Sequence, residues 1–267
     1  MSQFIVLLPR MEVTGANAQS AWWFLAPPSP TAYVGFGQAI ALKCLPPDAL
    51  QEFIGVGVVV HDYRLRAEKV EGTYQWLPHQ LRAAALINGD DYSSKNKNAL
   101  SLQPTARCDL TVSMAIVFEE DARVDMDQVT KFLRNARIAG GVVASASPEP
   151  ILLEGMGQVR DAIKRGFALH ARPDLMEPAS GEDTLDALLR ATLPTNENQN
   201  ANPWVMPATF GYATVTKIQD RVWTRDGHPH AFAEPLVGLV QLKSLKEASI
   251  PIWKFKRPSE RVFLVGH

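Results

Sequence analysis

Apolar and polar positions alternate most regularly over residues 109–118, where every even position is apolar. A period of two is that of a β-strand with one buried face, so this segment is predicted to be a strand. Gln3–Leu8 is a short apolar run typical of a strand, and Ile54–Val60 is a β-branched run typical of a central strand buried on both faces. Val142–Val143 and Ile151–Leu153 are further strand candidates.

The helical period separates these strands. Apolar residues recur at three- and four-residue spacing over residues 30–43 and again over 125–136. Ser29–Pro30 begins the first segment with an N-cap residue and a proline at the first helical position. Asp125 is placed to cap the second segment. The order from Gln3 to Leu153 is therefore strand, helix, strand, a polar segment, strand, helix, strand.

This order is that of the split βαβ fold, so we predict an α+β protein with a ferredoxin-like core. Residues from about 64 to 107 form a polar insertion between the second and third strands, and a connection this long is uncommon in a compact domain. After Glu154 the periodic signals weaken, and we expect a smaller, irregular C-terminal region. The predicted organisation is a core at 1–155, including the insertion, followed by a C-terminal region at 156–267.

The charge balance limits what the chain can bind through its overall field. Its 27 Lys and Arg residues are matched by 28 Asp and Glu residues, which gives a net charge of −1 at pH 7. No global field therefore indicates nucleic acid, a membrane surface or acidic substrates, and a nucleic-acid site would be a local patch. The clearest basic segment is Gln241–His267, where six Lys or Arg residues accompany two Glu residues.

The pattern indicates neither export nor a membrane span. The first ten residues lack the basic leader and cleavage site of a secretory signal. The longest uncharged stretch, Val13–Leu42, is interrupted by prolines and amides before it reaches the ~20 apolar residues of a spanning helix. Cys44 and Cys108 match no metal or redox spacing, which fits two buried thiols in a reducing compartment. We expect a cytoplasmic protein.

A search for catalytic, cofactor and metal motifs yields no complete set. Gly155–Arg160 resembles a dinucleotide-binding turn, but its third glycine position holds an arginine. His228 and His230 lack a third ligand at useful spacing. His61 with Asp62 ends a buried strand, where a base and its orienting carboxylate would be well placed, yet no nucleophile can be paired with them. We therefore expect no cofactor, no metal and no catalytic residue.

Basic and aromatic side chains point instead to RNA. The open face of a ferredoxin-like sheet commonly binds single-stranded RNA through stacked aromatic side chains and nearby cations. Candidates occur where the second strand leaves the sheet, in the insertion and after the second helix: Tyr63, Arg64, Arg66, Lys95, Lys97, Arg134 and Arg137. Each of them alone is better explained as a solvated surface charge, and the last two would also stabilise a helix C-terminus.

An ordered set of motifs along most of the chain carries a resemblance to a known family. The motifs are densest over residues 5–62: Leu8–Arg10, Gly15–Ala18, Pro28–Phe36, Gly55–His61, Ala106–Arg107, Leu110–Ser113, Arg137–Gly141, Gly166–Leu169 and Gly211–Tyr212. This set resembles the second Csy subunit of type I-F CRISPR surveillance complexes, a member of the Cas-five group of RAMP proteins. Gly15, where that family tends to have Asn, and the short second half indicate a divergent or variant member.

The resemblance implies a non-catalytic subunit of a Cascade-like interference complex in antiviral defence. Such a subunit binds the 5′ handle of CRISPR RNA (crRNA) and caps the backbone filament. Its implied partners are a Cas-seven-type backbone subunit, a large subunit where one exists, and target DNA in the assembled complex. The insertion at 64–107 lies where the family carries a thumb, which displaces a base from the guide–target duplex. Without a large subunit, this chain would take over part of motif recognition on DNA.

The same resemblance assigns expected roles to residues of this chain. Arg10, Asn17 and Ser20 are expected near the crRNA handle, where short polar side chains can meet phosphates and base edges. Tyr63, Arg64 and Arg66 are expected at the root of the thumb, and Lys95 and Lys97 at its tip. The C-terminal basic segment is expected to meet RNA, DNA or an acidic partner surface through three residues: Lys254, Lys256 and Arg257.

Two other functions stay open. Some members of the Cas-five group cleave precursor crRNA, and in such an enzyme His61 would be the general base. Alternatively, the chain is a protein-only adaptor that joins subunits without touching RNA. Charge reversal at Arg64 and Arg66 would then leave RNA affinity unchanged.

Overall fold

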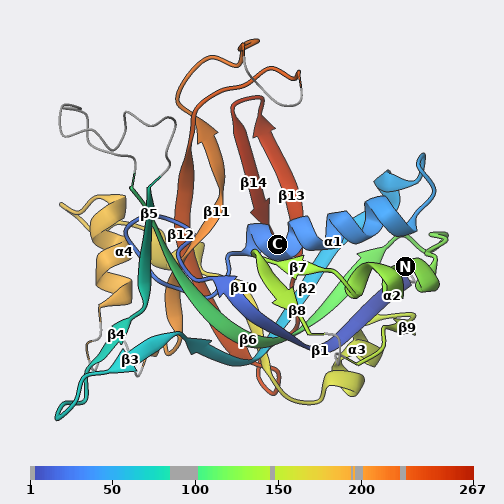
Figure 1. The fold of residues 1–267 in the computed structure, drawn as a ribbon, viewed down its shortest axis with the longest axis horizontal. Helices are drawn as coiled ribbons and strands as arrows, with labels where there is room; N and C mark the ends of the chain where they lie inside the picture. The colour runs from blue at the N-terminus through green and yellow to red at the C-terminus, as the bar shows by residue number, and fades with distance from the viewer. Residues whose placement is uncertain (1–3, 85–101, 145–147, 194, 196–200, 223–226) are drawn as a thin grey trace.

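The computed structural model describes residues 4–84, 102–144, 148–193, 195, 201–222 and 227–267. Its strands are β1 (Phe4–Asn17), β2 (Phe53–Leu65), β3 (Ala67–Lys69), β4 (Trp76–Pro78), β5 (Gln80–Ala84), β6 (Leu102–Phe118), β7 (Arg137–Ile138), β8 (Gly141–Val143), β9 (Ile151–Leu153), β10 (Phe167–Ala171), β11 (Val205–Thr214), β12 (Ala233–Ser244), β13 (Ile252–Ser259) and β14 (Val262–Gly266). Its helices are α1 (Pro30–Cys44), α2 (Met126–Leu133), α3 (Met156–Ile163) and α4 (Thr184–Thr192), with 3₁₀ turns η1 (Leu50–Glu52) and η3 (Pro173–Met176). The fold is mixed α/β, with one large, curved antiparallel sheet and few helices (Figure 1).

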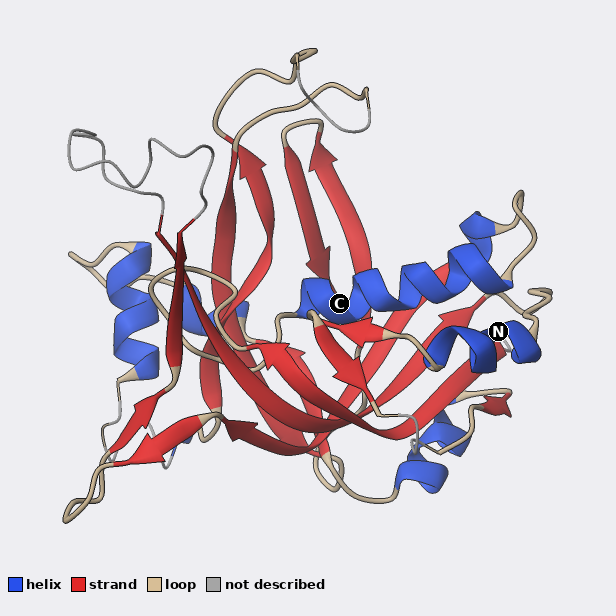
Figure 2. Ribbon diagram, in the orientation of Figure 1, coloured by secondary structure: helices blue, strands red, loops and turns tan. Residues whose placement is uncertain are grey.

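Alternation along β1 and β6 determines which helices cover each face of the first half. The strands follow the order β2-β6-β1-β8, with antiparallel neighbours. Met114 and Ile116 of β6 belong to the core beneath α1 and α2, whereas Ala115 and Val117 pack with Val159 of α3. In Figure 2, α1 and α2 accordingly lie above this part of the sheet and α3 lies below it. The strand and helix predictions for this half are confirmed.

Strands of the second half continue the sheet and form a closed ring. The pairings run β10–β12–β11–β14–β13–β2 and return to β10, because β2 pairs with β13 at Val56–Gly57 and with β10 at Val59–Val60. Trp253 of β13 is fully buried in this ring, where its indole packs against Phe210. The indole Nε1–H donates a 2.9 Å hydrogen bond to the Leu169 carbonyl of β10. Trp253 therefore joins the two strands that share one edge of β2.

Two glycines of β2 allow β13 to approach this closely. A Cβ atom at Gly55 would collide with the Trp253 carbonyl oxygen, and one at Gly57 would lie 2.8 Å from Cγ2 of Ile250. A side chain at either position would push the strands apart, so glycine is required by the packing rather than by a turn.

The structure corrects the expected character of the C-terminal region and shows strands in the insertion. The C-terminal region is not irregular, since it carries the strands β10–β14 and the helices α3 and α4. The described part of the insertion at 64–107 is also ordered, as a β3–β4 hairpin and as β5 paired with an extended start of β6. Both segments owe their strands to pairing partners far away in sequence, which local periodicity does not reveal. The division at residue 155 stays a prediction.

Two further expectations, on membrane spans and on the two cysteines, can be compared with the described residues. No helix among them is long and apolar enough to cross a membrane. Cys44 and Cys108 are buried and unpaired with each other, as expected.

Candidate nucleic-acid interface

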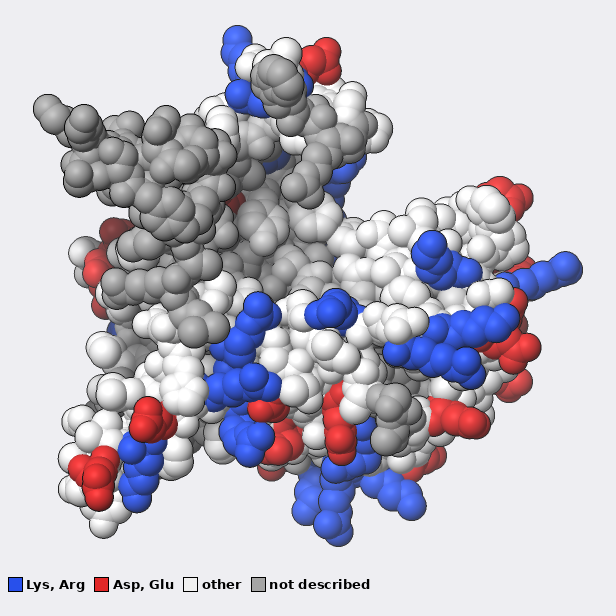
Figure 3. All heavy atoms as spheres, viewed as in Figure 1, with Lys and Arg blue, Asp and Glu red and all other residues white. Residues whose placement is uncertain are grey.

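The sheet face opposite α1 and α2 is apolar at one end and polar at the other. Beneath α3 this face presents Ala115 and Val117 of β6. Because side chains alternate along a strand, Ser113 and Asp109 lie on the same face further along β6. Lys and Arg side chains gather near the middle of the view in Figure 3, over β1 and β6. We call the polar end of this face the open face.

β1 leaves regular pairing with β6 at two bulges, and a polar side chain of β6 anchors each of them. At the first bulge Arg10 has φ +43°, a value that is uncommon for a residue with a side chain. Its backbone N–H donates a 2.8 Å hydrogen bond to Oγ of Ser113, which is fully buried. Bulges redirect side chains, and this one leaves Arg10 exposed.

His61 of β2 completes this first anchor. Its Nε2 lies 2.7 Å from Ser113 Oγ, and its Nδ1 lies 3.2 Å from Nη1 of Arg10. Burial, together with the Arg10 charge, lowers the pKa of His61 to about 4, so the ring is neutral at pH 7. Because an arginine N–H can only donate, Nδ1 accepts it and the ring proton lies on Nε2, directed at Ser113. Both ring nitrogens are thereby engaged.

Asp109 anchors the second bulge, where Gly15 has φ +70°. Its Oδ1 accepts the Gly15 backbone N–H at 2.9 Å and Nη2 of Arg66 at 2.7 Å, while Oδ2 accepts Nη2 of Arg64 at 3.2 Å. The Arg66 hydrogen bond, with those from Gly15 and Arg64, lowers the pKa of Asp109 to about 2. The Arg64 side chain is 77% exposed, so its guanidinium remains accessible to a ligand.

Two further arginines lie nearby, one at this bulge and one on the neighbouring β7–β8 hairpin. Nη1 of Arg107 donates to the Gly15 carbonyl at 3.1 Å, and Nη1 of Arg137 donates to the Gly140 carbonyl at 3.2 Å. The β7–β8 hairpin that contains Gly140 is held against the end of β1, since the Asn17 N–H donates to the Ala139 carbonyl at 2.9 Å. The arginine cluster is the resulting set of four side chains: Arg64, Arg66, Arg107 and Arg137. Grouped guanidinium ions of this kind attract phosphates.

Asn17 and Ser20 line one cavity of about 380 Å³, together with Tyr212. The Asn17 amide is folded onto the backbone of Gln19, accepting its N–H at 3.1 Å and donating to its carbonyl at 3.2 Å. Ser20 Oγ accepts a 3.1 Å hydrogen bond from the Thr209 hydroxyl. The two predicted handle residues therefore lie together, beside the end of β1 that carries the arginine cluster.

The other predicted residues are placed separately. Tyr63 packs against the core, and burial raises its pKa. Arg134 is exposed at the end of α2. The three predicted residues of the C-terminal basic segment are exposed on β13: Lys254, Lys256 and Arg257. Two predicted residues lie outside the described part of the chain: Lys95 and Lys97. Within the described part, no group of three or more His, Cys, Asp or Glu residues could hold a metal ion.

Three residues that organise this face were not among the predicted site residues: Arg107, Asp109 and Ser113. All three occupy odd positions of β6, the strand with the clearest alternation. Polar residues at these positions interrupt a face that is apolar at Ala115 and Val117. That interruption was the available signal, because it marks where a buried sheet face becomes an accessible one.

The architecture and this face define a mixed α/β protein with an arginine cluster on an open sheet surface. A comparison with protein families then identifies the chain further. The family described as CRISPR-associated protein (Cas_Csy2) matches residues 6–264, nearly the whole chain. The chain therefore belongs to the Csy2 family and is a CRISPR-associated subunit of a type I-F surveillance complex, as its motifs indicated. No curated protein matches the chain.

Proposed function

We propose that this chain binds the 5′ handle of crRNA and caps the backbone filament of its complex, without catalysing a reaction itself. The observation that carries the proposal is the arginine cluster: Arg64, Arg66 and Arg107 bond Asp109 or Gly15 at the second bulge of β1, and Arg137 lies on the adjoining β7–β8 hairpin. Phosphate contacts of Arg residues provide most of the affinity for nucleic acid and fix its position. The adjacent cavity with Asn17 and Ser20 offers polar groups for base edges.

The topology supports a ferredoxin-like core as the platform for this binding. The strand order β2-β6-β1-β8, with α1 after β1 and α2 after β6 on one face, is the order expected of that fold. The opposite face is then the one available to RNA. The insertion between β2 and β6 would act as the thumb of the family, with the β3–β4 hairpin and β5 in its described part.

The geometry of His61 favours binding over RNA cleavage. A general base needs a free ring nitrogen within reach of the proton that it removes. In His61 one nitrogen faces Arg10 and the other faces Ser113, and the lowered pKa makes the ring a weak base. This arrangement supports a role for His61 in positioning Arg10 toward RNA.

The proposed partners follow from membership in a surveillance complex. They are crRNA, a Cas-seven-type backbone subunit, a large subunit where the system has one, and target DNA once the complex is assembled, all in the cytoplasm. A protein-only adaptor is the competing function, and its surfaces would not need an arginine cluster.

Binding of the purified chain to labelled guide RNA tests the proposal. The RNA carries its 5′ handle intact, scrambled or deleted, and affinity is measured over a salt series, with and without the backbone subunit. We expect the intact handle to bind most tightly. Reversing charge in Arg64→Glu/Arg66→Glu should weaken binding at least about tenfold and reduce the slope of log affinity against log salt by about two.

A matched control keeps the change in net charge but moves it elsewhere. Lys43 and Lys217 are exposed on α1 and on the loop after β11, so Lys43→Glu/Lys217→Glu should leave handle preference and salt slope nearly unchanged. Equal effects of the two double variants, or equal affinity for all three RNAs in the presence of the backbone subunit, would contradict handle binding and support the adaptor. Cleavage of precursor RNA by the wild type and its loss in His61→Ala would support the enzyme.

A further inference from the structure

A groove with an aromatic centre runs beside the open face, at the outer edge of β2. Pairing between β2 and β10 ends at Val60 and Phe167, and beyond that point the edge of β2 borders the smaller of two adjoining hollows. They measure about 320 and 760 Å³ and share three lining residues: Phe167, Trp204 and Leu242. Both volumes lie in the range of about 300–1,000 Å³ that small-molecule sites occupy.

Trp204 is held in an unusual conformation at the centre of this groove. Its φ is +62°, which bulky residues rarely adopt, and its side chain is 67% exposed. An exposed indole in a strained backbone gains nothing from burial, so some other requirement must maintain it.

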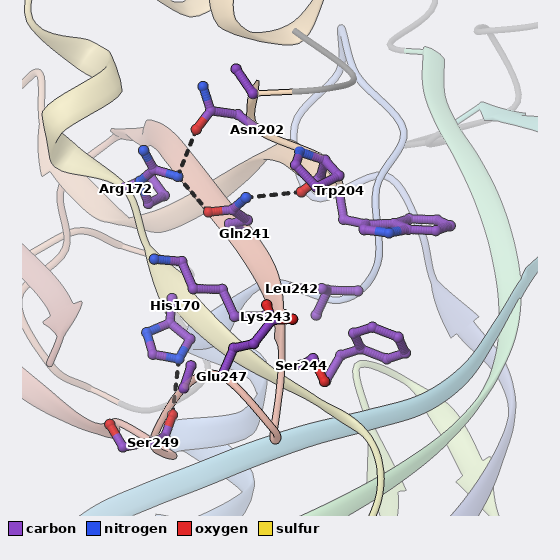
Figure 4. A pocket seen from close by; sticks show the side chains of 14 residues that line it. His170, Arg172, Asn202, Trp204, Gln241, Leu242, Lys243, Ser244, Glu247 and Ser249 are labelled. Carbon is purple, nitrogen blue, oxygen red and sulfur yellow. Dashed lines mark hydrogen bonds between the residues drawn. The ribbon is translucent and has the colours of Figure 1, made fainter.

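A hydrogen-bond network fixes the backbone on both sides of Trp204 (Figure 4). The Leu242 N–H donates to the Trp204 carbonyl at 3.3 Å, and Nε2 of buried Gln241 donates to the Pro203 carbonyl at 2.9 Å. Arg172 in turn donates to Oε1 of Gln241 and to Oδ1 of Asn202. In Figure 4 the indole points away from this network, so the polar groups secure its base and leave its ring accessible.

The groove combines aromatic surface with charges at both ends. Phe167 is 40% exposed beside Trp204, and Tyr63 lines the smaller hollow. At one end Arg10 lies against His61, with Asp62 next to it; at the other end Lys243 lines the groove with Glu247. Cations can meet phosphates on either side of an aromatic platform, and a carboxylate can accept the exocyclic amino group of a base.

His61 connects this groove to the open face. Its ring bonds Arg10 and Ser113 on the open face and also lines the smaller hollow. Arg64 of the arginine cluster follows His61 by three residues on β2, so an RNA strand bound at the cluster lies close to the groove. This continuity, with cations at both ends, favours a nucleotide over an apolar protein segment as the occupant.

We propose that the groove is a binding site for one unpaired nucleotide of the guide RNA, whose base stacks on Trp204 beside Phe167. The proposal rests on the proposed function and extends it, because it gives the bound RNA a base-stacking site separate from the phosphate contacts of the arginine cluster. Stacking on an aromatic ring is tolerant of base identity, so the site would bind any unpaired base rather than one of the four bases specifically.

An abasic scan of the guide RNA tests this assignment. A set of labelled guide RNAs, each with one abasic ribonucleotide, is bound to the full wild-type chain and to Trp204→Ala. We expect Trp204→Ala to weaken binding of intact RNA by about 5- to 100-fold, the range of base–aromatic stacking. One abasic position should weaken wild-type binding to a similar degree and should cause no further loss with Trp204→Ala. Trp204→Phe should restore most of the affinity.

Trp22→Ala is the matched control, because it removes another exposed indole, at 78% exposure. Its effect should be the same for every abasic RNA. Intact RNA binding as tight in Trp204→Ala as in wild type, or losses that add at every position, would overturn the site and leave handle binding standing. Loss of backbone-subunit assembly with unchanged RNA affinity would also overturn it, in favour of a protein occupant. Absence of handle preference in the wild type would remove both proposals.

Discussion

The two bulges of β1 solve the same structural problem with different chemistry. In each, a backbone N–H that is lost from regular strand pairing is accepted by a side chain of β6. At Arg10 the acceptor is the neutral, fully buried hydroxyl of Ser113, supported by His61. At Gly15 it is the ionised carboxylate of Asp109, which also binds Arg64 and Arg66.

The difference shows how one strand can hold arginine side chains in two ways. The neutral anchor holds a single arginine, Arg10, against His61, which lines the aromatic groove. The charged anchor gathers several arginines and keeps them in register with the backbone through the Gly15 N–H. The first anchor should therefore depend on the protonation of His61, and the second on the charge of Asp109.

Of the changes to the two anchors, replacing Asp109 should have the largest effect on the free energy of unfolding. Its pKa is lowered from 3.8 to about 2, which corresponds to about 1–2 kcal/mol of stabilisation at neutral pH after allowance for the exposure of its arginine partners. Asp109→Ala also leaves the Gly15 N–H without its acceptor and places the guanidinium groups beside one another. We expect the free energy of unfolding at pH 7, measured by chemical denaturation, to fall by about 2–3 kcal/mol.

Two variants separate charge from hydrogen bonding at this anchor. Asp109→Asn keeps an acceptor for the Gly15 N–H and should lose less than Asp109→Ala. Glu12→Ala removes an exposed carboxylate from β1 and should stay within about 0.5 kcal/mol of wild type. A loss below about 0.5 kcal/mol in Asp109→Ala would show that the charged anchor does not stabilise the fold.

Acidification should weaken the neutral anchor first. The folded pKa of His61, about 4, lies below its ordinary value of 6.5, so the unfolded chain binds more protons between these values. Stability therefore falls as pH drops from about 6.5 to about 4, by about 1–2 kcal/mol after allowance for the partial exposure of His61. The Asp109 contribution is present above pH 3.8 and is lost only as pH falls toward 2.

Denaturation of wild type and His61→Gln at a series of pH values isolates this effect. Burial also lowers the pKa of His170 and His267, but both residues remain in the variant, so their contributions cancel in the difference. The difference in unfolding free energy should shrink with falling pH between 6.5 and 4. A difference independent of pH would mean that His61 titrates normally and that Arg10 does not depend on its neutral form.

The sequence predicted the elements of this region better than their contacts. Alternation at 109–118 and the helical stripes at 30–43 and 125–136 reflect local burial, and the structure confirms all three. The extra residues of the two bulges are visible only against their partner strand, so periodicity along β1 alone could not locate them. Arg64 and Arg66 were predicted as a pair, but Asp109, which joins them, lies more than 40 residues away.

In the second half of the chain, local sequence patterns predict still less of the structure. β10–β14 depend on pairing around a closed ring, and Trp253 fills that ring through contacts with β10 and β11. Trp204 had no sequence signal, because the residues that hold the backbone beside it, Gln241 and Arg172, lie far away in sequence. Local composition predicts where a chain is buried, whereas sites of this kind require its long-range register.

The smallest effect should come from Gly15, where the backbone conformation alone is tested. A Cβ atom there would meet Nη2 of Arg66 at 3.6 Å, an ordinary contact, so the cost of a side chain is conformational. Gly15→Ala should reduce the free energy of unfolding by about 1 kcal/mol, because an alanine resists φ +70°. Gly15→Asn should cost about half as much, since Asn adopts left-handed values more readily. Equal losses in the two variants would instead show that contact with Arg66 limits the position, and the charged anchor would then constrain side chains as well as the backbone.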